Sequence, residues 1–108
     1  MSRGKSVTYV LGTLSVDFAK RLVTVNGKEV RLTRIEWLLL SELAQNAGRL
    51  MLYEELLTRV WGMEYRDDVQ LLRTWISRLR YKVEQDPGNP SVIRTMPKTG
   101  YIMDEPSE

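Results

Sequence analysis

Apolar and polar residues alternate in the N-terminal third of the chain, as they do in half-buried β-strands. In LSVDF, residues 14–18, every second side chain is apolar, which places the apolar side chains on one face of a strand. A weaker alternation in TYVLG, residues 8–12, predicts another strand ahead of it. The N-terminal third is therefore expected to form a small antiparallel sheet.

A hairpin is the clearest feature of this region. In RLVTVNGKEVRL, residues 21–32, Asn26-Gly27 separates two alternating runs. A type I′ turn needs positive φ at both central residues, and this dipeptide is the one that such turns prefer. The apolar residues expected to face one another across the turn are Val23 and Val25 on one side and Val30 and Leu32 on the other.

The apolar spacing changes to three and four residues after position 32, where the first helix is expected. Thr33 and Glu36 match a capping box, in which each side chain accepts a hydrogen bond from the other residue's backbone N–H. The apolar stripe continues to Gln45, and Asn46-Ala47-Gly48 then ends the helix. Glycine suits that position because it adopts the left-handed conformation that helix ends need.

Two more helices follow, over 53–60 and about 69–84, with a polar loop at 61–68 between them. Asp67 or Asp68 is expected to cap the third helix, because a carboxylate oxygen can accept from its first free N–H groups.

The chain ends in a second hairpin. Pro87, in the segment DPGNP, cannot continue a helix. The short runs VIRT and YIM then predict two strands over 92–103, with MPKTG at the tip and basic residues at Arg94 and Lys98.

The third helix has two distinct faces when its residues are placed at 100° intervals. The apolar stripe, which is expected to contact the core, consists of Val69, Leu72, Ile76, Leu79 and Val83. The opposite side carries Gln70, Thr74, Ser77, Arg78 and Tyr81. One shoulder carries Leu71, Trp75 and Lys82, and the other carries Arg73 and Arg80.

Charge is concentrated in the same region. The chain of 108 residues has a net charge of +2, but residues 69–101 hold six basic and two acidic side chains. A local excess of this kind favours an anionic partner. A purely solvated helix face is the alternative, but Trp75 and Leu71 are expected to be exposed there, which is unusual for such a face.

Composition narrows the chemistry that is available. The chain has no Cys and no His, so it lacks thiolates and the commonest general base and neutral metal ligand. The adjacent acidic pairs, Glu54-Glu55 and Asp67-Asp68, are interpreted as helix N-terminal charge and caps. We therefore expect no enzyme activity, no metal and no cofactor. With no disulfide framework and no signal-peptide pattern, the cytoplasm is the expected compartment.

The side chains on the polar face of the third helix are those that read or hold DNA. Arg78 can make a bidentate contact with guanine, Gln70 can pair with adenine, and Thr74 or Leu71 can meet a thymine methyl group. Side chains expected to hold phosphates are Arg80, Tyr81 and Lys82.

Three stretches carry a resemblance to a known family. They are LTRIEWLLLSELAQNAGRLMLYEELLTRVWG (32–62), LRTWISRLRYKVEQDPGNPSVIRT (72–95) and TGYIM (99–103). Over residues 8–103 the chain resembles the winged-helix output domains of OmpR/PhoB response regulators. The resemblance implies an α+β winged helix-turn-helix fold: a four-stranded antiparallel sheet, three helices and a C-terminal hairpin wing. It also implies sequence-specific binding of double-stranded DNA for transcription control, in a bacterial, nucleoid-associated location.

The resemblance assigns roles on the third helix, which it places in the major groove. Arg78 matches the base-reading arginine and Arg80 a phosphate-side arginine. Ser77 replaces an arginine, which removes one phosphate contact. Trp75 stands where many members have His and is expected to meet sugar or phosphate, while Arg73 replaces a usual Asp.

In the wing, residues 92–103, the family arginine that enters the minor groove is missing. Lys98 is expected to substitute for it as a point charge. Thr99, Tyr101 and Trp61 match positions that touch phosphates in relatives.

The resemblance also implies partners outside this chain. Family members carry a phosphoaccepting receiver domain before this one, dimerise when activated, and in some cases contact RNA polymerase through the segment that matches loop 61–68. Residues 1–7 are interpreted as a linker or remnant, and 104–108 as an acidic tail. A protein–protein module on the same fold remains the main alternative.

Overall fold

Helix α1 (Arg34–Gln45) is the central element of the fold, and its sequence sets both of its ends. Thr33 Oγ1 accepts from Glu36 N at 3.3 Å, and Glu36 Oε1 accepts from Thr33 N at 2.9 Å. This confirms the capping box. The helix ends before Gly48, whose φ of +85° is the left-handed conformation expected there. The computed structural model describes residues 8–107.

The N-terminal strands form one antiparallel sheet in the order β1-β2-β3-β4. Their bounds are Thr8–Leu11, Leu14–Asp17, Leu22–Val25 and Lys28–Glu29. Asn26 and Gly27 both have positive φ, +55° and +77°, as the predicted turn requires. The last strand is shorter than expected, because the two-residue turn pairs Val25 with Lys28 and the ladder ends soon afterwards.

Two further helices and a second sheet complete the fold. Helix α2 is Tyr53–Val60 and helix α3 is Val69–Val83, with a short 3-10 helix, η1 (Met63–Tyr65), in the loop between them. The wing consists of β6 (Ile93–Met96) and β7 (Gly100–Met103). Strand β5 (Met51–Leu52) was not expected; it pairs with β7 and makes the wing part of a three-stranded sheet.

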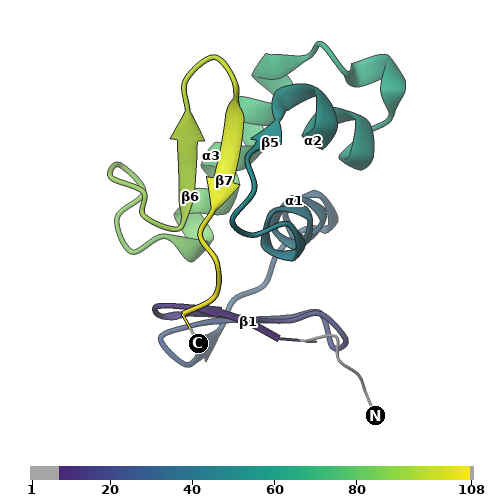
Figure 1. Cartoon of the computed structure of the whole chain (residues 1–108). Helices are drawn as coiled ribbons and strands as arrows, with labels where there is room; N and C mark the ends of the chain where they lie inside the picture. The colour runs from purple at the N-terminus through teal and green to yellow at the C-terminus, as the bar shows by residue number, and fades with distance from the viewer. Residues whose placement is uncertain (1–7, 108) are drawn as a thin grey trace.

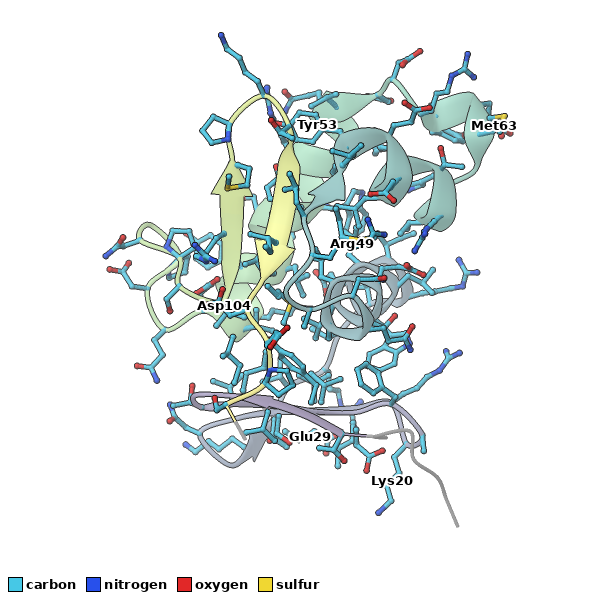
Figure 2. All side chains as sticks on the ribbon, in the orientation of Figure 1. Lys20, Glu29, Arg49, Tyr53, Met63 and Asp104 are labelled. Atoms are coloured by element: carbon cyan, nitrogen blue, oxygen red, sulfur yellow. The ribbon has the colours of Figure 1, made fainter. Side chains whose placement is uncertain are left out.

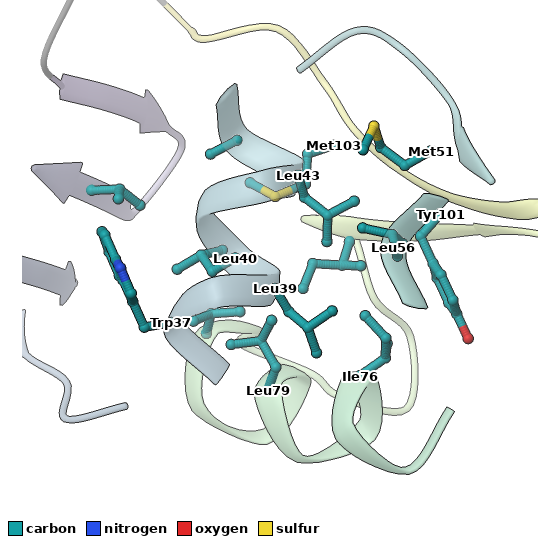
Figure 3. Packing of buried hydrophobic residues seen from close by; sticks show 14 of the residues in the cluster. Trp37, Leu39, Leu40, Leu43, Met51, Leu56, Ile76, Leu79, Tyr101 and Met103 are labelled. Carbon is teal, nitrogen blue, oxygen red and sulfur yellow. The ribbon is translucent and has the colours of Figure 1, made fainter. Parts of the chain in front are cut away.

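The two sheets lie on different sides of α1. Figure 1 shows the N-terminal sheet as one layer, with α1 above it and the wing, α2 and α3 beyond. In Figure 3, Trp37 points toward the N-terminal strands, whereas Leu39 lies beside Ile76 and Leu79 of α3. All four side chains are buried. One helix therefore supplies apolar contacts to both layers, which sets the position of α3 in the molecule.

A polar contact also joins α1 to α3. Lys82 Nζ donates to Glu36 Oε1 at 2.7 Å and to the Arg31 carbonyl oxygen at 3.0 Å. Burial by itself raises the pKa of Glu36, but hydrogen bonds from Lys82 and Thr33 and the charge of Lys82 outweigh it, so this pKa lies below 4.5. The carboxylate is therefore ionised at neutral pH and holds the C-terminal part of α3 against the start of α1.

The C-terminal segment crosses the N-terminal sheet. The Tyr9 hydroxyl donates to the Asp104 carbonyl oxygen, and Ser107 N donates to the Val10 carbonyl oxygen at 2.7 Å. Burial and the nearby charge of Asp104 raise the pKa of Tyr9 to about 12. Residues 104–107, interpreted from the sequence as an acidic tail, thus connect the wing sheet to β1.

Gly100 allows β5 to pair with the wing. A Cβ atom at this position would overlap the Met51 carbonyl oxygen and lie 2.8 Å from its carbonyl carbon. We predict that Gly100→Ala lowers the free energy of unfolding by about 2–3 kcal/mol, because backbone atoms must move apart. Gly27→Ala is the matched control: its Cβ meets no atom within 4 Å, so only the positive φ costs energy, about 1 kcal/mol. Urea unfolding of both variants measures the difference. Equal losses would contradict the steric role of Gly100.

Candidate nucleic-acid interface

Helix α3 buries one face and exposes the other, as its sequence predicts. Asp68 caps it, with Oδ1 accepting from Leu71 N at 3.2 Å. The buried side chains are Leu72, Ile76, Leu79 and Val83. The exposed side chains are Gln70, Arg73, Ser77, Arg78 and Tyr81, and Tyr81 is 76% exposed. Thr74 lies among them and is half-buried.

Trp75 and Leu71 are not the exposed apolar side chains that the sequence suggested. Both are half-buried and pack against the core. The helical wheel placed them on a shoulder, and the core extends far enough to cover part of that shoulder. Trp75 also lies under a cation, since the Arg78 guanidinium carbon is 4.7 Å from its ring centroid.

Arg80 connects α3 to the wing from the shoulder of the helix beside the apolar stripe. Its Nε and Nη2 donate to the Ile93 carbonyl oxygen at 3.1 and 2.6 Å, and Nη2 also donates to Thr95 Oγ1 at 2.7 Å. Its guanidinium lies 5.5 Å from the Tyr101 ring centroid. Burial lowers the pKa of Arg80 below its ordinary value, partly countered by Tyr101 and Glu84. These contacts give Arg80 a structural role between α3 and the wing, and its phosphate contact stays a prediction for Nη1, which takes part in none of the three bonds.

Glu84 makes the second connection between α3 and the wing, and sequence reasoning missed it. Its buried carboxylate accepts from the backbone N–H groups of Ser91, Val92 and Ile93 at 2.7–3.0 Å. A carboxylate at a helix C-terminus is unfavourable to the helix dipole. That mismatch, just before a proline-containing turn, was the signal in the sequence that Glu84 has a partner elsewhere.

Lys82 is also turned inward. Its ammonium group is held by Glu36 and the Arg31 carbonyl oxygen, as described above. The phosphate contact expected of Lys82 stays a prediction, since its side chain is 36% exposed. The helical wheel gave the direction of its Cβ but could not show that a long side chain bends back toward α1.

The wing presents one cation at its tip. Lys98 is exposed and has a φ of +63°, a conformation that favours glycine. Thr99 Oγ1 donates to the Pro97 carbonyl oxygen at 3.1 Å, which tightens the turn beside Lys98. Arg94, at the base of the wing, forms an ion pair with Asp104. Figure 2 shows Asp104 at that base, away from the hairpin tip.

Tyr101 belongs to strand β7 of the wing, but its side chain is buried and does not lie on the wing surface. It is 4% exposed, and its ring centroid is 5.9 Å from that of Tyr53. Burial raises the pKa of its hydroxyl above 10, and the charge of Tyr53 adds to this, whereas Arg80 and Arg73 lower it. Because the ring of Tyr101 is buried, its hydroxyl group is the part of the side chain to which the expected phosphate contact is limited.

Loop 61–68 projects beside the start of α3. Trp61 is half-buried at the end of α2, whereas Met63 is 65% exposed and Tyr65 is 42% exposed. In Figure 2, Met63 lies at the edge of the molecule, on the side away from the wing. Among residues 8–107, the side chains that pack against the core include Trp61 but neither Met63 nor Tyr65.

The free cations of the candidate surface are few. Across residues 8–107 the four ion pairs involve Arg49, Arg59, Lys82 and Arg94. Arg73, Arg78 and Lys98 are exposed and take part in none of them. These three residues lie on α3 and the wing, the two elements that Arg80 and Glu84 join.

Residues 8–107 contain no group of three or more acidic side chains placed to hold a metal ion. None of the helices in this range is both long and apolar enough to span a bilayer. A surface hollow of about 730 Å³ lies between β1, the end of α1 and Pro106, and no residue of α3 lines it.

A family model matches most of this fold. Residues 27–103 match the family described as "Transcriptional regulatory protein, C terminal". Relatives include the transcriptional regulatory protein AfsQ1 of Streptomyces coelicolor, which is 39% identical over 88% of this chain and 42% of its own length. KdpE of Mycobacterium tuberculosis is 40% identical over 82% of this chain and 39% of its own length. The chain thus spans about two fifths of these relatives.

Solved structures agree with this assignment. The response regulator DrrB of Thermotoga maritima, an OmpR/PhoB homologue, has a TM-score of 0.83 and 33% identity, over 93% of this chain and 45% of that one. The DNA-binding domain of Klebsiella pneumoniae RstA, solved with the RstA box, has a TM-score of 0.81 and 32% identity, over 92% and 98%. The chain belongs to the C-terminal domains of transcriptional regulatory proteins, of the OmpR/PhoB winged-helix type.

Proposed function

We propose that this chain binds specific double-stranded DNA sequences for transcription control, as the output domain of a two-component response regulator. The observation that carries the proposal is the joined surface of α3 and the wing, where Arg73, Arg78 and Lys98 are exposed without carboxylate partners. The RstA domain, which is similar over almost its whole length, was solved with a DNA box.

The exposed side chains of α3 are proposed to contact the base edges. A helix fits the major groove, and a base-reading side chain must be free to form two hydrogen bonds with one base edge. Arg78 meets this requirement for guanine, and Gln70 meets it for adenine. Thr74, half-buried between them, offers its methyl group to thymine.

Phosphate contacts come from the edges of the same surface. Those that fit are Trp61, Arg73, Ser77, Tyr81, Lys98 and Thr99, all of them exposed or half-buried. The wing tip then brings Lys98 to the neighbouring minor groove as a point charge. Arg80, Lys82 and Arg94 already have partners within this chain, so we give them a smaller share of the direct contacts.

The family and the greater length of its members also support partners other than DNA. The curated relatives are more than twice as long as the matched region, which leaves room for a receiver domain. We propose that such a domain controls dimer formation on repeated half-sites. The exposed side chains of Met63 and Tyr65 support a proposed contact of loop 61–68 with RNA polymerase.

The same loop supports the alternative function, a protein-binding module on a winged-helix fold. Met63 and Tyr65 are large apolar side chains exposed to water, and such side chains are frequent at protein interfaces. A salt titration of duplex binding separates the two functions. DNA binding must weaken steeply as salt rises, whereas a protein module gives no duplex binding even at low salt.

Arg78→Ala tests base reading. We expect a loss of about 1–3 kcal/mol in the discrimination between a selected duplex and a scrambled one, because a bidentate guanine contact is removed. Non-specific affinity should fall much less. Fluorescence anisotropy with both duplexes, the first obtained by selection from a random pool, gives the measurement. An equal loss on the two duplexes would exclude Arg78 as a base reader.

Lys98→Gly tests the wing. One phosphate contact is lost, so the slope of log K against log salt should decrease in magnitude by about 1. Thermal stability should change little, because glycine adopts the positive φ of this residue without strain.

Lys20→Ala is the matched control for the wing. It removes the same charge from the N-terminal sheet, at the opposite end of the molecule in Figure 2, and should leave the slope unchanged. If both variants reduce the slope equally, the wing has no specific role.

A further inference from the structure

The proposed function does not use the contact between exposed Arg78 and Trp75 of α3. The guanidinium carbon lies 4.7 Å from the Trp75 ring centroid, a distance typical of cation–π attraction. The two residues are three apart on a helix, so their side chains are neighbours on its surface. No carboxylate within residues 8–107 forms an ion pair with Arg78.

Trp75 is a rigid support for that cation. Its ring is half-buried and packs against the core, which limits its rotamers. Side chains on a helix lean toward its N-terminus. The stack therefore holds the Arg78 guanidinium against the Trp75 ring, on the shoulder of α3 that Trp75 occupies.

A free arginine side chain has many rotamers and must give most of them up when it binds one base. A planar guanidinium already stacked on an indole has given up part of this freedom, and its outer edge still carries free N–H donors. Preorganisation of this kind strengthens a contact without adding a new one.

We propose that Trp75 is a positioning residue for Arg78, which sets the discrimination for guanine without itself touching the base. The inference rests on the proposed function, since it deepens the role given there to Arg78. It differs from a direct contact of the indole with sugar or phosphate, and the two roles predict different results.

The binding test uses Trp75→Leu, Trp75→Phe, Arg78→Ala and the double variant Trp75→Leu/Arg78→Ala. Each is titrated against a selected duplex and against duplexes with single guanines replaced. Trp75→Leu should reduce discrimination about two- to fivefold, and only at the guanine that Arg78→Ala also affects. Trp75→Phe, which keeps an aromatic face, should retain most of it. In the Arg78→Ala background, Trp75→Leu should cause no further loss.

Two outcomes of this titration overturn the proposal. One is an additive loss in the double variant. The other is a weaker salt dependence of Trp75→Leu on every duplex, which would mean that Trp75 holds a phosphate directly.

A second readout needs no DNA. In the free protein, the Arg78 Nε–H proton signal should be shifted upfield by the indole ring current, and Trp75→Leu should remove that shift. Arg21 is the control, because its guanidinium carbon lies 5.9 Å from the ring centroid of Trp37 in α1. The Nε–H signal of Arg21 should not change in Trp75→Leu. The core methyl signals of the same spectra verify that the variant is folded.

The two readouts separate the two claims. If the Arg78 shift is lost in Trp75→Leu but no duplex is discriminated by the wild-type chain, the stack exists and the proposed function fails. If the wild-type chain discriminates and Arg78→Ala abolishes this, while Trp75→Leu changes neither shift nor discrimination, only the positioning role is overturned.

Discussion

The connection between the end of α3 and the start of the wing is the constraint on which the rest of the surface depends. The Glu84 carboxylate accepts from three successive backbone N–H groups of Ser91, Val92 and Ile93. Arg80, one turn earlier, donates to the carbonyl oxygen of Ile93. Bonds to a charged group are stronger than neutral ones, and both groups are partly or fully withdrawn from water. The helix and the hairpin are therefore held at one angle before any partner binds.

Apart from Arg94, which pairs with Asp104, the basic residues of α3 and the wing fall into two groups. Arg80 and Lys82 are used inside the molecule, where they fix α3 against the wing and against α1. Arg73, Arg78 and Lys98 are left on the surface that the first group positions. The chain has a net charge of only +2. It can still present a cationic surface, because Arg80 and Lys82 hold in place the elements that carry the three exposed cations. Preorganisation lowers the entropy lost on binding.

Local signals in the sequence predicted most of the fold. The Asn26-Gly27 turn, the Thr33–Glu36 capping box and the apolar stripe of α3 each act within a few residues, and each is present as predicted. Strand β5 was missed because two residues carry no periodicity. The site was harder to predict: a helical wheel gives the direction of Cβ, but Arg80 and Lys82 bend toward partners 13 to 51 residues away in the sequence.

The most direct test of this account is to measure residual dipolar couplings of backbone N–H groups in α3 and in β6–β7, for the wild-type chain and for Glu84→Ala. The account predicts that one alignment tensor fits both elements in the wild-type chain. In the variant, with α3 still folded, the wing should require a different tensor or lose its couplings through averaging. A single tensor that fits both elements of the variant would contradict it.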